Sequence, residues 1–242
     1  MSVASANQDL AITIRPDLSA AITRALDHIA SPGAWWTGAE RLAIVTEVRR
    51  AFHCPLCAER KAALSPYGVA GEHDGDSTLP AAIIDMVHRI ASDPGRISKR
   101  LYDDTIAAGI EAPRYAETLG VIVRTVNMEY FYRALGLASP DLPAAQAGDP
   151  SGRVPDGLAE GEAWLPMLPT RHAEFDGRAL PNVGRAMSSA PAEVLAMADL
   201  ATAEYMDMSH VADPTYEPGR AINRSQMELI AGRVSAINEC FY

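Results

Sequence analysis

The cysteine pair in Cys54-Pro-Leu-Cys57 is the part of the sequence whose residue types and spacing are best suited to chemistry. On one helix, two residues three apart lie on the same face, roughly 60° apart around the axis, so their sulfurs are within reach. A thiolate can attack a substrate, and a neighbouring thiol can then resolve the mixed disulfide. The spacing therefore indicates a thiol–disulfide redox site.

Attack at neutral pH requires a lowered thiol pKa, which nearby positive charge favours. The sequence supplies five candidates for that charge: Arg49, Arg50, His53, Arg60 and Lys61. Glu47 and Glu40 stand seven and fourteen residues before Cys54, so either could relay a proton. We expect the pair near the C-terminal end of a long helix, whose partial negative charge would oppose thiolate formation.

Two other interpretations of the pair stay open. The cysteines could be buried and inert, or they could be half of a zinc site, for which His53, His73 and Cys240 are the plausible further ligands. His73 precedes Asp74 in a Gly/Asp-rich loop, and His88 follows near the end of the next predicted helix. A histidine with an aspartate can act as a general base, although such residues more often hold loops and cap helices.

The elements that must position these residues read as helices. Apolar residues recur at helical spacing, and alternating strand patterns are scarce. The predicted helices cover about 17–29, 40–64, 80–93, 96–109, 113–136 and 191–208, with a last one that begins at Asn223 or Ser225. Thr37 and Glu40 form a predicted capping box. The expected fold class is all-α, with helices packed on helices.

Residues 137–181 are rich in proline and glycine and show no clear period. We interpret them as a long connecting loop between an N-terminal half (residues 1–136), which carries the Cys54–Cys57 pair, and a C-terminal half (residues 182–242). In the last helix, Met227, Ile230, Val234 and Ile237 form the apolar stripe.

The segment from Arg224 to Cys240, RSQMELIAGRVSAINEC, resembles the signature helix of the alkylhydroperoxidase AhpD-like/carboxymuconolactone decarboxylase superfamily. Glu228 stands where that helix carries a glutamate, twelve residues before its first cysteine. The segment around Cys54–Cys57 resembles a second, more diverged copy. There Leu42 takes the place of the glutamate, and Lys61 takes the place of the histidine that follows the cysteines.

The resemblance implies an AhpD-like helical bundle of two pseudo-repeated halves that assembles into homo-oligomers. It also implies reduction of a small peroxide or disulfide with no prosthetic group or metal, with electrons from a dithiol reductant protein. The candidate catalytic residues are Cys54, Cys57, Cys240, Glu228, His53, Glu47 and Glu117. Glu117 is included because the helix after the cysteine helix often faces the site in this superfamily. Cys240 could be resolved by Cys54 or Cys57 if the two helix ends meet.

Two functions of other classes remain open. One is a cofactor-free lyase or isomerase in which Glu and His do acid–base work, and the other is a non-catalytic helical oligomer. A plain ion pair between Glu228 and Arg224 is the structural alternative to a catalytic glutamate.

Charge and hydropathy restrict the partners and the location. The 242-residue chain has 21 basic and 31 acidic residues, a net charge of −10, which argues against nucleic acid or an anionic membrane as partner. We find no signal-peptide pattern and no apolar run near the ~20 residues that span a bilayer. With three cysteines and no sign of export, a cytoplasmic location is expected.

Overall fold

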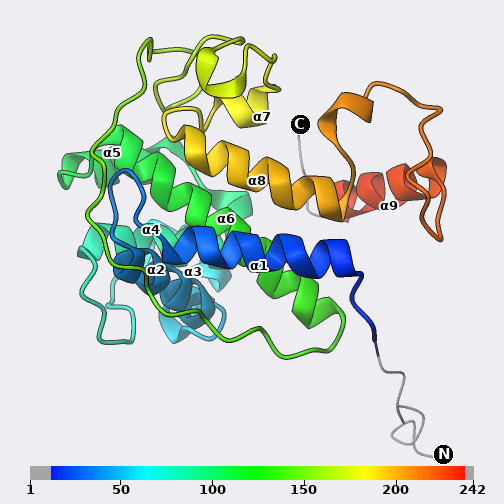
Figure 1. The fold of residues 1–242 in the computed structure, drawn as a ribbon. Helices are drawn as coiled ribbons and strands as arrows, with labels where there is room; N and C mark the ends of the chain where they lie inside the picture. Colours follow the sequence, from blue (N-terminus) through cyan, green and yellow to red (C-terminus); the bar gives the residue numbers. More distant parts are fainter. Residues whose placement is uncertain (1–11, 238–242) are drawn as a thin grey trace, which may run out of the picture.

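The structure is a computed structural model that describes residues 12–237, and within that range it is a bundle of α-helices (Figure 1). The helices are α1 (Pro16–Ala30), α2 (Gly38–Ala51), α3 (Pro55–Ala62), α4 (Ala81–Ser92), α5 (Lys99–Ala107), α6 (Ala112–Ala134), α7 (Asn182–Arg185), α8 (Pro191–Glu204) and α9 (Arg224–Ile237). Extended pairing in the described range is limited to two isolated bridges. The predicted all-α class is confirmed.

Helix α2 lies at the centre of the bundle and packs against α1, α4 and α6. Its residues Ile44, Val45 and Val48 are almost completely buried. The predicted capping box at its start is confirmed: the Glu40 amide donates to Thr37 Oγ1 at 3.3 Å, and the Thr37 amide donates to Glu40 Oε2 at 2.8 Å. Two backbone amides at the N-terminus of α2 therefore have hydrogen-bond partners within the same turn.

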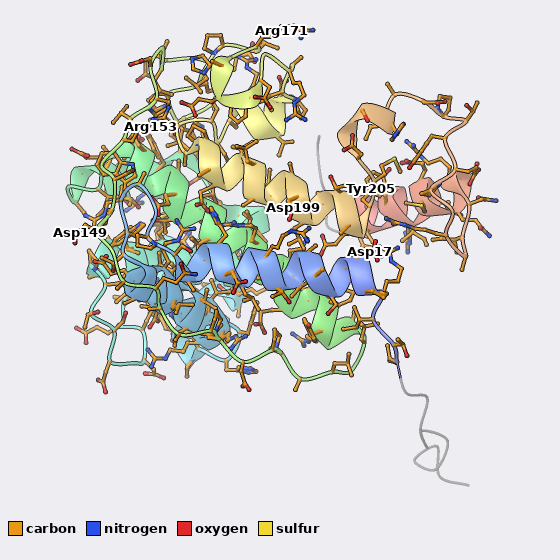
Figure 2. All side chains as sticks on the ribbon, viewed as in Figure 1. Asp17, Asp149, Arg153, Arg171, Asp199 and Tyr205 are labelled. Atoms are coloured by element: carbon orange, nitrogen blue, oxygen red, sulfur yellow. The ribbon has the colours of Figure 1, made fainter. Side chains whose placement is uncertain are left out.

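Helices α1 and α8 run antiparallel and side by side (Figure 1). Arg24 on α1 forms a two-bond pair with Asp199 on α8, at 2.9 Å for each bond, and Figure 2 shows Asp199 next to α1. One turn further along α1, His28 Nε2 lies 3.0 Å from Glu193 Oε1. Through these contacts α8 closes the bundle over α1, and it also packs on α6.

The single helix predicted over residues 40–64 is wrong, because the chain bends between α2 and α3. Pro55 cannot continue a helix, and it forces Cys54 into an extended conformation with φ −72° and ψ 123°. Helix α2 therefore ends at Ala51, and α3 begins at Pro55 with Cys54 as its N-cap residue. The cysteines lie at the start of a helix rather than at its end.

The predicted connecting loop, residues 137–181, contains two bridges and one short 3₁₀ helix (Ala173–Phe175) but no α-helix. It is held to the bundle by backbone hydrogen bonds, with the Gln146 amide donating to the Ala30 carbonyl at 2.9 Å and the Ser151 amide to the Gly33 carbonyl at 3.1 Å. The short helix α7 follows directly and was not predicted. The division of the chain into two halves stays a prediction.

Helix α9 lies at the edge of the bundle, beside the end of α8 (Figure 1). Met227 from its predicted stripe is buried, but Ile230, Val234 and Ile237 are exposed. Cys240 lies outside the described residues, so the predicted correspondence between α9 and the Cys54–Cys57 segment stays a prediction.

A cluster of buried charges joins α2, α6 and α8. Arg41 donates from Nη1 to Glu117 Oε1 at 2.6 Å and from Nη2 to Glu193 Oε1 at 2.9 Å, and Arg124 pairs with the other oxygen of Glu193. All four side chains are at most 2% exposed. Because buried charges are costly to desolvate, removing one partner destabilises the fold by leaving the other charges uncompensated.

We predict that Glu193→Ala lowers the free energy of unfolding by about 3–5 kcal/mol, because two buried guanidinium groups lose their shared carboxylate. Urea unfolding followed by far-UV circular dichroism measures this loss. Asp199→Asn is the matched control: it breaks the exposed Arg24 pair on the same helix and should change stability little. Equal effects of the two changes would contradict a special role for the buried cluster.

The Glu193 carboxylate also makes the stability of the protein depend on pH. Burial alone would raise the pKa of Glu193, but the charge of Arg124, the His28 hydrogen bond and the charge of Arg41 outweigh burial and lower the pKa to about 2. The stabilisation is therefore fully present above the ordinary carboxyl pKa of 4.5 and is lost as the pH falls toward about 2. We predict that the stability gap between wild type and Glu193→Gln narrows over this interval in urea unfolding. If the free energies of unfolding of the two proteins changed in parallel over this pH interval, the lowered pKa of Glu193 would be contradicted.

Candidate functional site

The two cysteines lie at the N-terminal end of α3, both free thiols and both buried. Cys54 is the N-cap residue, and Cys57 lies in the first turn. The N-terminus of a helix carries partial positive charge, which stabilises a thiolate. The expectation that a helix C-terminus would oppose thiolate formation is therefore wrong, and its cause is the bend that Pro55 imposes.

His73 reaches both cysteines from the loop before α4. Its Nδ1 lies 3.5 Å from Cys54 Sγ and 3.8 Å from Cys57 Sγ. On the other side of the ring, Nε2 lies 3.0 Å from Asp85 Oδ1, and Arg60 Nη1 donates to that same oxygen at 2.5 Å. The loop histidine is thus fixed between the two sulfurs and a paired carboxylate.

His88 approaches Cys57 from α4. Its Nδ1 lies 3.3 Å from Cys57 Sγ, its Nε2 lies 2.9 Å from Glu47 Oε2, and the ring is completely buried. Arg50 Nη1 in turn donates to Glu47 Oε1 at 2.6 Å. The two histidines therefore have the same arrangement. In each, Nδ1 faces a cysteine sulfur and Nε2 faces a carboxylate that forms an ion pair with an arginine.

The four side chains meet at one point, with one ligand atom of each lying within 4.8 Å of every other. We call Cys54, Cys57, His73 and His88 the Cys–His cluster. Two thiols and two imidazoles are donors that zinc prefers, and the same groups can exchange protons and electrons. The geometry is thus compatible with redox chemistry and with metal binding.

Charge within the cluster favours a thiolate beside an imidazolium. Burial alone would lower the pKa of His73, but its hydrogen bonds with Asp85, Cys57 and Cys54 outweigh burial and raise the pKa to about 10. Burial would raise the pKa of Cys54, whereas the hydrogen bond with His73 brings it below the ordinary thiol value. Burial lowers the pKa of His88 despite its bond to Glu47, and the charge of His73 adds to that effect.

Of the other predicted site residues, Glu47 belongs to this site, but it contacts His88 rather than a cysteine. His53 is exposed and lines a surface cavity of about 410 Å³ with Phe52 and Tyr130. Glu117 is bonded elsewhere, to Arg41 in the buried charge cluster and to the amide of Trp35 at 2.7 Å.

Glu228 accepts from Arg224 Nε at 2.5 Å, which is the ion pair named as the structural alternative to a catalytic role. Tyr205, which Figure 2 labels at the end of α8, donates to the same carboxylate. The Tyr205 hydrogen bond ties α9 to the end of α8. Cys240 lies outside the described residues.

The sequence interpretation missed Asp85 altogether, and it did not place His88 with the cysteines. His73 was matched with its neighbour Asp74, whereas its carboxylate partner in the fold is Asp85. Asp85 and His88 are three residues apart on α4, so they share a face. That spacing was the available signal.

No family model, curated protein or solved structure gives a significant match to this chain. The resemblance to the AhpD-like superfamily stays a prediction. None of the described helices is both long enough and apolar enough to cross a membrane.

Proposed function

We propose that the protein is a thiol-dependent oxidoreductase that reduces a small peroxide or disulfide through Cys54 and Cys57. One observation carries the proposal: two free thiols at a helix N-terminus share one histidine, with His73 Nδ1 3.5 Å from one sulfur and 3.8 Å from the other. The two sulfurs lie within 4.8 Å of each other, so they can form a disulfide, and the two histidines beside them can move the protons that the steps require.

Cys54 is the attacking residue in this proposal. As the N-cap residue it receives the partial positive charge of α3, and its hydrogen bond with His73 favours the thiolate. With a hydroperoxide ROOH, the Cys54 thiolate attacks the terminal oxygen and the O–O bond breaks. The cysteine becomes a sulfenic acid, and ROH leaves with a proton that His73 supplies.

Cys57 then resolves the sulfenic acid. Its thiol lies 3.3 Å from His88 Nδ1, and Glu47 holds the opposite side of that ring. His88 takes the thiol proton and the Cys57 sulfur attacks the Cys54 sulfur. The S–O bond breaks, and the leaving hydroxide takes that proton and departs as water as the disulfide forms. An external dithiol reductant restores both thiols and becomes a disulfide itself. The dithiol protein and the homo-oligomer implied by the resemblance belong to this proposal.

We predict that Cys54→Ser abolishes hydroperoxide consumption in the presence of dithiothreitol and a metal chelator. Cys57→Ser should lose turnover but still accumulate a sulfenic acid at Cys54, because only the resolving step is missing. Peroxide assays, with dimedone trapping and mass spectrometry, measure both effects. Wild type treated with peroxide alone should yield a Cys54–Cys57 disulfide.

A histidine pair supplies the control for this test. His73→Ala should slow sulfenic acid formation at least tenfold, since general acid–base groups contribute about 10²–10⁴-fold. His172→Ala removes a histidine in the connecting loop, outside the Cys–His cluster, and should leave the rate unchanged. Peroxide consumption that survives replacement of all three cysteines would contradict the proposal.

A further inference from the structure

We infer that the Cys–His cluster binds one zinc ion through Cys54 Sγ, Cys57 Sγ, His73 Nδ1 and His88 Nδ1. The inference goes beyond the proposed reaction and rests on the geometry of the four donors, independent of any redox activity. Zinc in proteins is held in a tetrahedral arrangement by this kind of donor set, two thiolates and two imidazole nitrogens.

The donor atoms have the spacing that a zinc ion requires. With Zn–S bonds of about 2.3 Å and Zn–N bonds of about 2.0–2.1 Å, a tetrahedral S–N edge is roughly 3.5–3.6 Å. The S–N distances observed here are 3.3, 3.5 and 3.8 Å, and every pair of donor atoms lies within 4.8 Å. The three S–N distances therefore differ from the tetrahedral edge by only a few tenths of an ångström.

Both histidines already have the orientation of metal ligands. Metal-bound histidines usually donate their second ring N–H to a carboxylate, which fixes the tautomer and keeps the other nitrogen free for the metal. His73 Nε2 lies 3.0 Å from Asp85, and His88 Nε2 lies 2.9 Å from Glu47. In both histidines the carboxylate occupies Nε2, and the remaining nitrogen, Nδ1, faces the cysteine sulfurs.

Charge and burial are consistent with a closed site. Two thiolates neutralise a divalent cation, and the carboxylates behind the histidines are each paired with an arginine, Arg60 or Arg50. Cys54, Cys57 and His88 are buried, and the His73 side chain is 8% exposed. Four protein ligands leave no open coordination position, which is typical of a structural zinc site.

Zinc would also control access to the dithiol, and this part of the inference rests on the proposed function. Both thiolates are occupied while zinc is bound. Oxidation of the pair by a hydroperoxide then follows a balanced reaction: the two zinc-bound thiolates, ROOH and two protons give the disulfide, ROH, water and free Zn²⁺. A disulfide cannot hold the ion as two thiolates do, so oxidation and metal release occur together.

Titration of the reduced, metal-free full chain with Co²⁺ tests the metal site directly. We expect one cobalt ion per chain, the intense visible bands of tetrahedral cobalt, a sulfur-to-cobalt charge-transfer band in the near ultraviolet, and displacement of cobalt by one equivalent of Zn²⁺. A folded protein that gives no tetrahedral cobalt spectrum, or that binds no Zn²⁺ in competition with a chromogenic chelator, would overturn the inference.

Variants assign the ligands. Cys57→Ser should lose the tetrahedral cobalt spectrum, whereas His53→Ala removes an exposed histidine next to Cys54 and should leave it unchanged. Asp85→Asn and Glu47→Gln keep all four donors, so they should retain the spectrum but weaken zinc binding by about 10–100-fold. Unchanged zinc affinity in both carboxylate variants, or loss of the spectrum in His53→Ala, would contradict this ligand set.

Peroxide added to the zinc-loaded chain separates the metal site from the reaction. Release of one Zn²⁺ per disulfide supports the coupling of the two. Stoichiometric zinc binding, combined with no disulfide when the metal-free chain is treated with peroxide, would leave the metal site standing and reject the proposed oxidoreductase. Peroxide reduction by a chain that binds no zinc would reject the metal site alone.

Discussion

The hydrogen bond between Glu47 Oε2 and His88 Nε2 connects the core of the protein to its chemistry. Both groups are almost completely buried, on α2 and α4, the two helices most extensively packed against each other. The bond gives the carboxylate a partner, and it turns His88 Nδ1 toward Cys57. Glu47 also pairs with Arg50 through its other oxygen, so the bond to His88 satisfies the second oxygen of a buried carboxylate. The contact between α2 and α4 and the orientation of the histidine thus depend on the same bond.

Local patterns in the sequence accounted for much of the fold. Caps, proline stops and apolar spacing predicted α1, α4, α5, α6 and α8, because these signals act over a few residues. One continuous helix through Cys54 was predicted because the apolar spacing continues past residue 51. Pro55, however, cannot continue a helix, so the chain bends there. The exposed stripe of α9 could not be foreseen, since apolar spacing does not tell which neighbours are present to cover it.

The candidate site was only partly predictable for a different reason. The cysteine pair is a local motif, but His73 reaches it across a loop and His88 from another helix. Their contacts depend on how α3 and α4 pack, which no spacing rule encodes. Asp85 belongs to the site only through its contact with His73, which the sequence does not reveal. Glu117, which was predicted to belong to the site, pairs instead with Arg41.

The residues around the Cys–His cluster come from one continuous stretch of chain, between Glu47 and His88, and their hydrogen bonds join residues at most 41 positions apart. The buried charge cluster instead requires Arg41 to meet Glu193, 152 positions away. Contacts between residues close in sequence form faster, and synthesis delivers the N-terminal ones first. The cysteines and histidines can thus come together before α8 has been synthesised, whereas the buried charge cluster can form only after it.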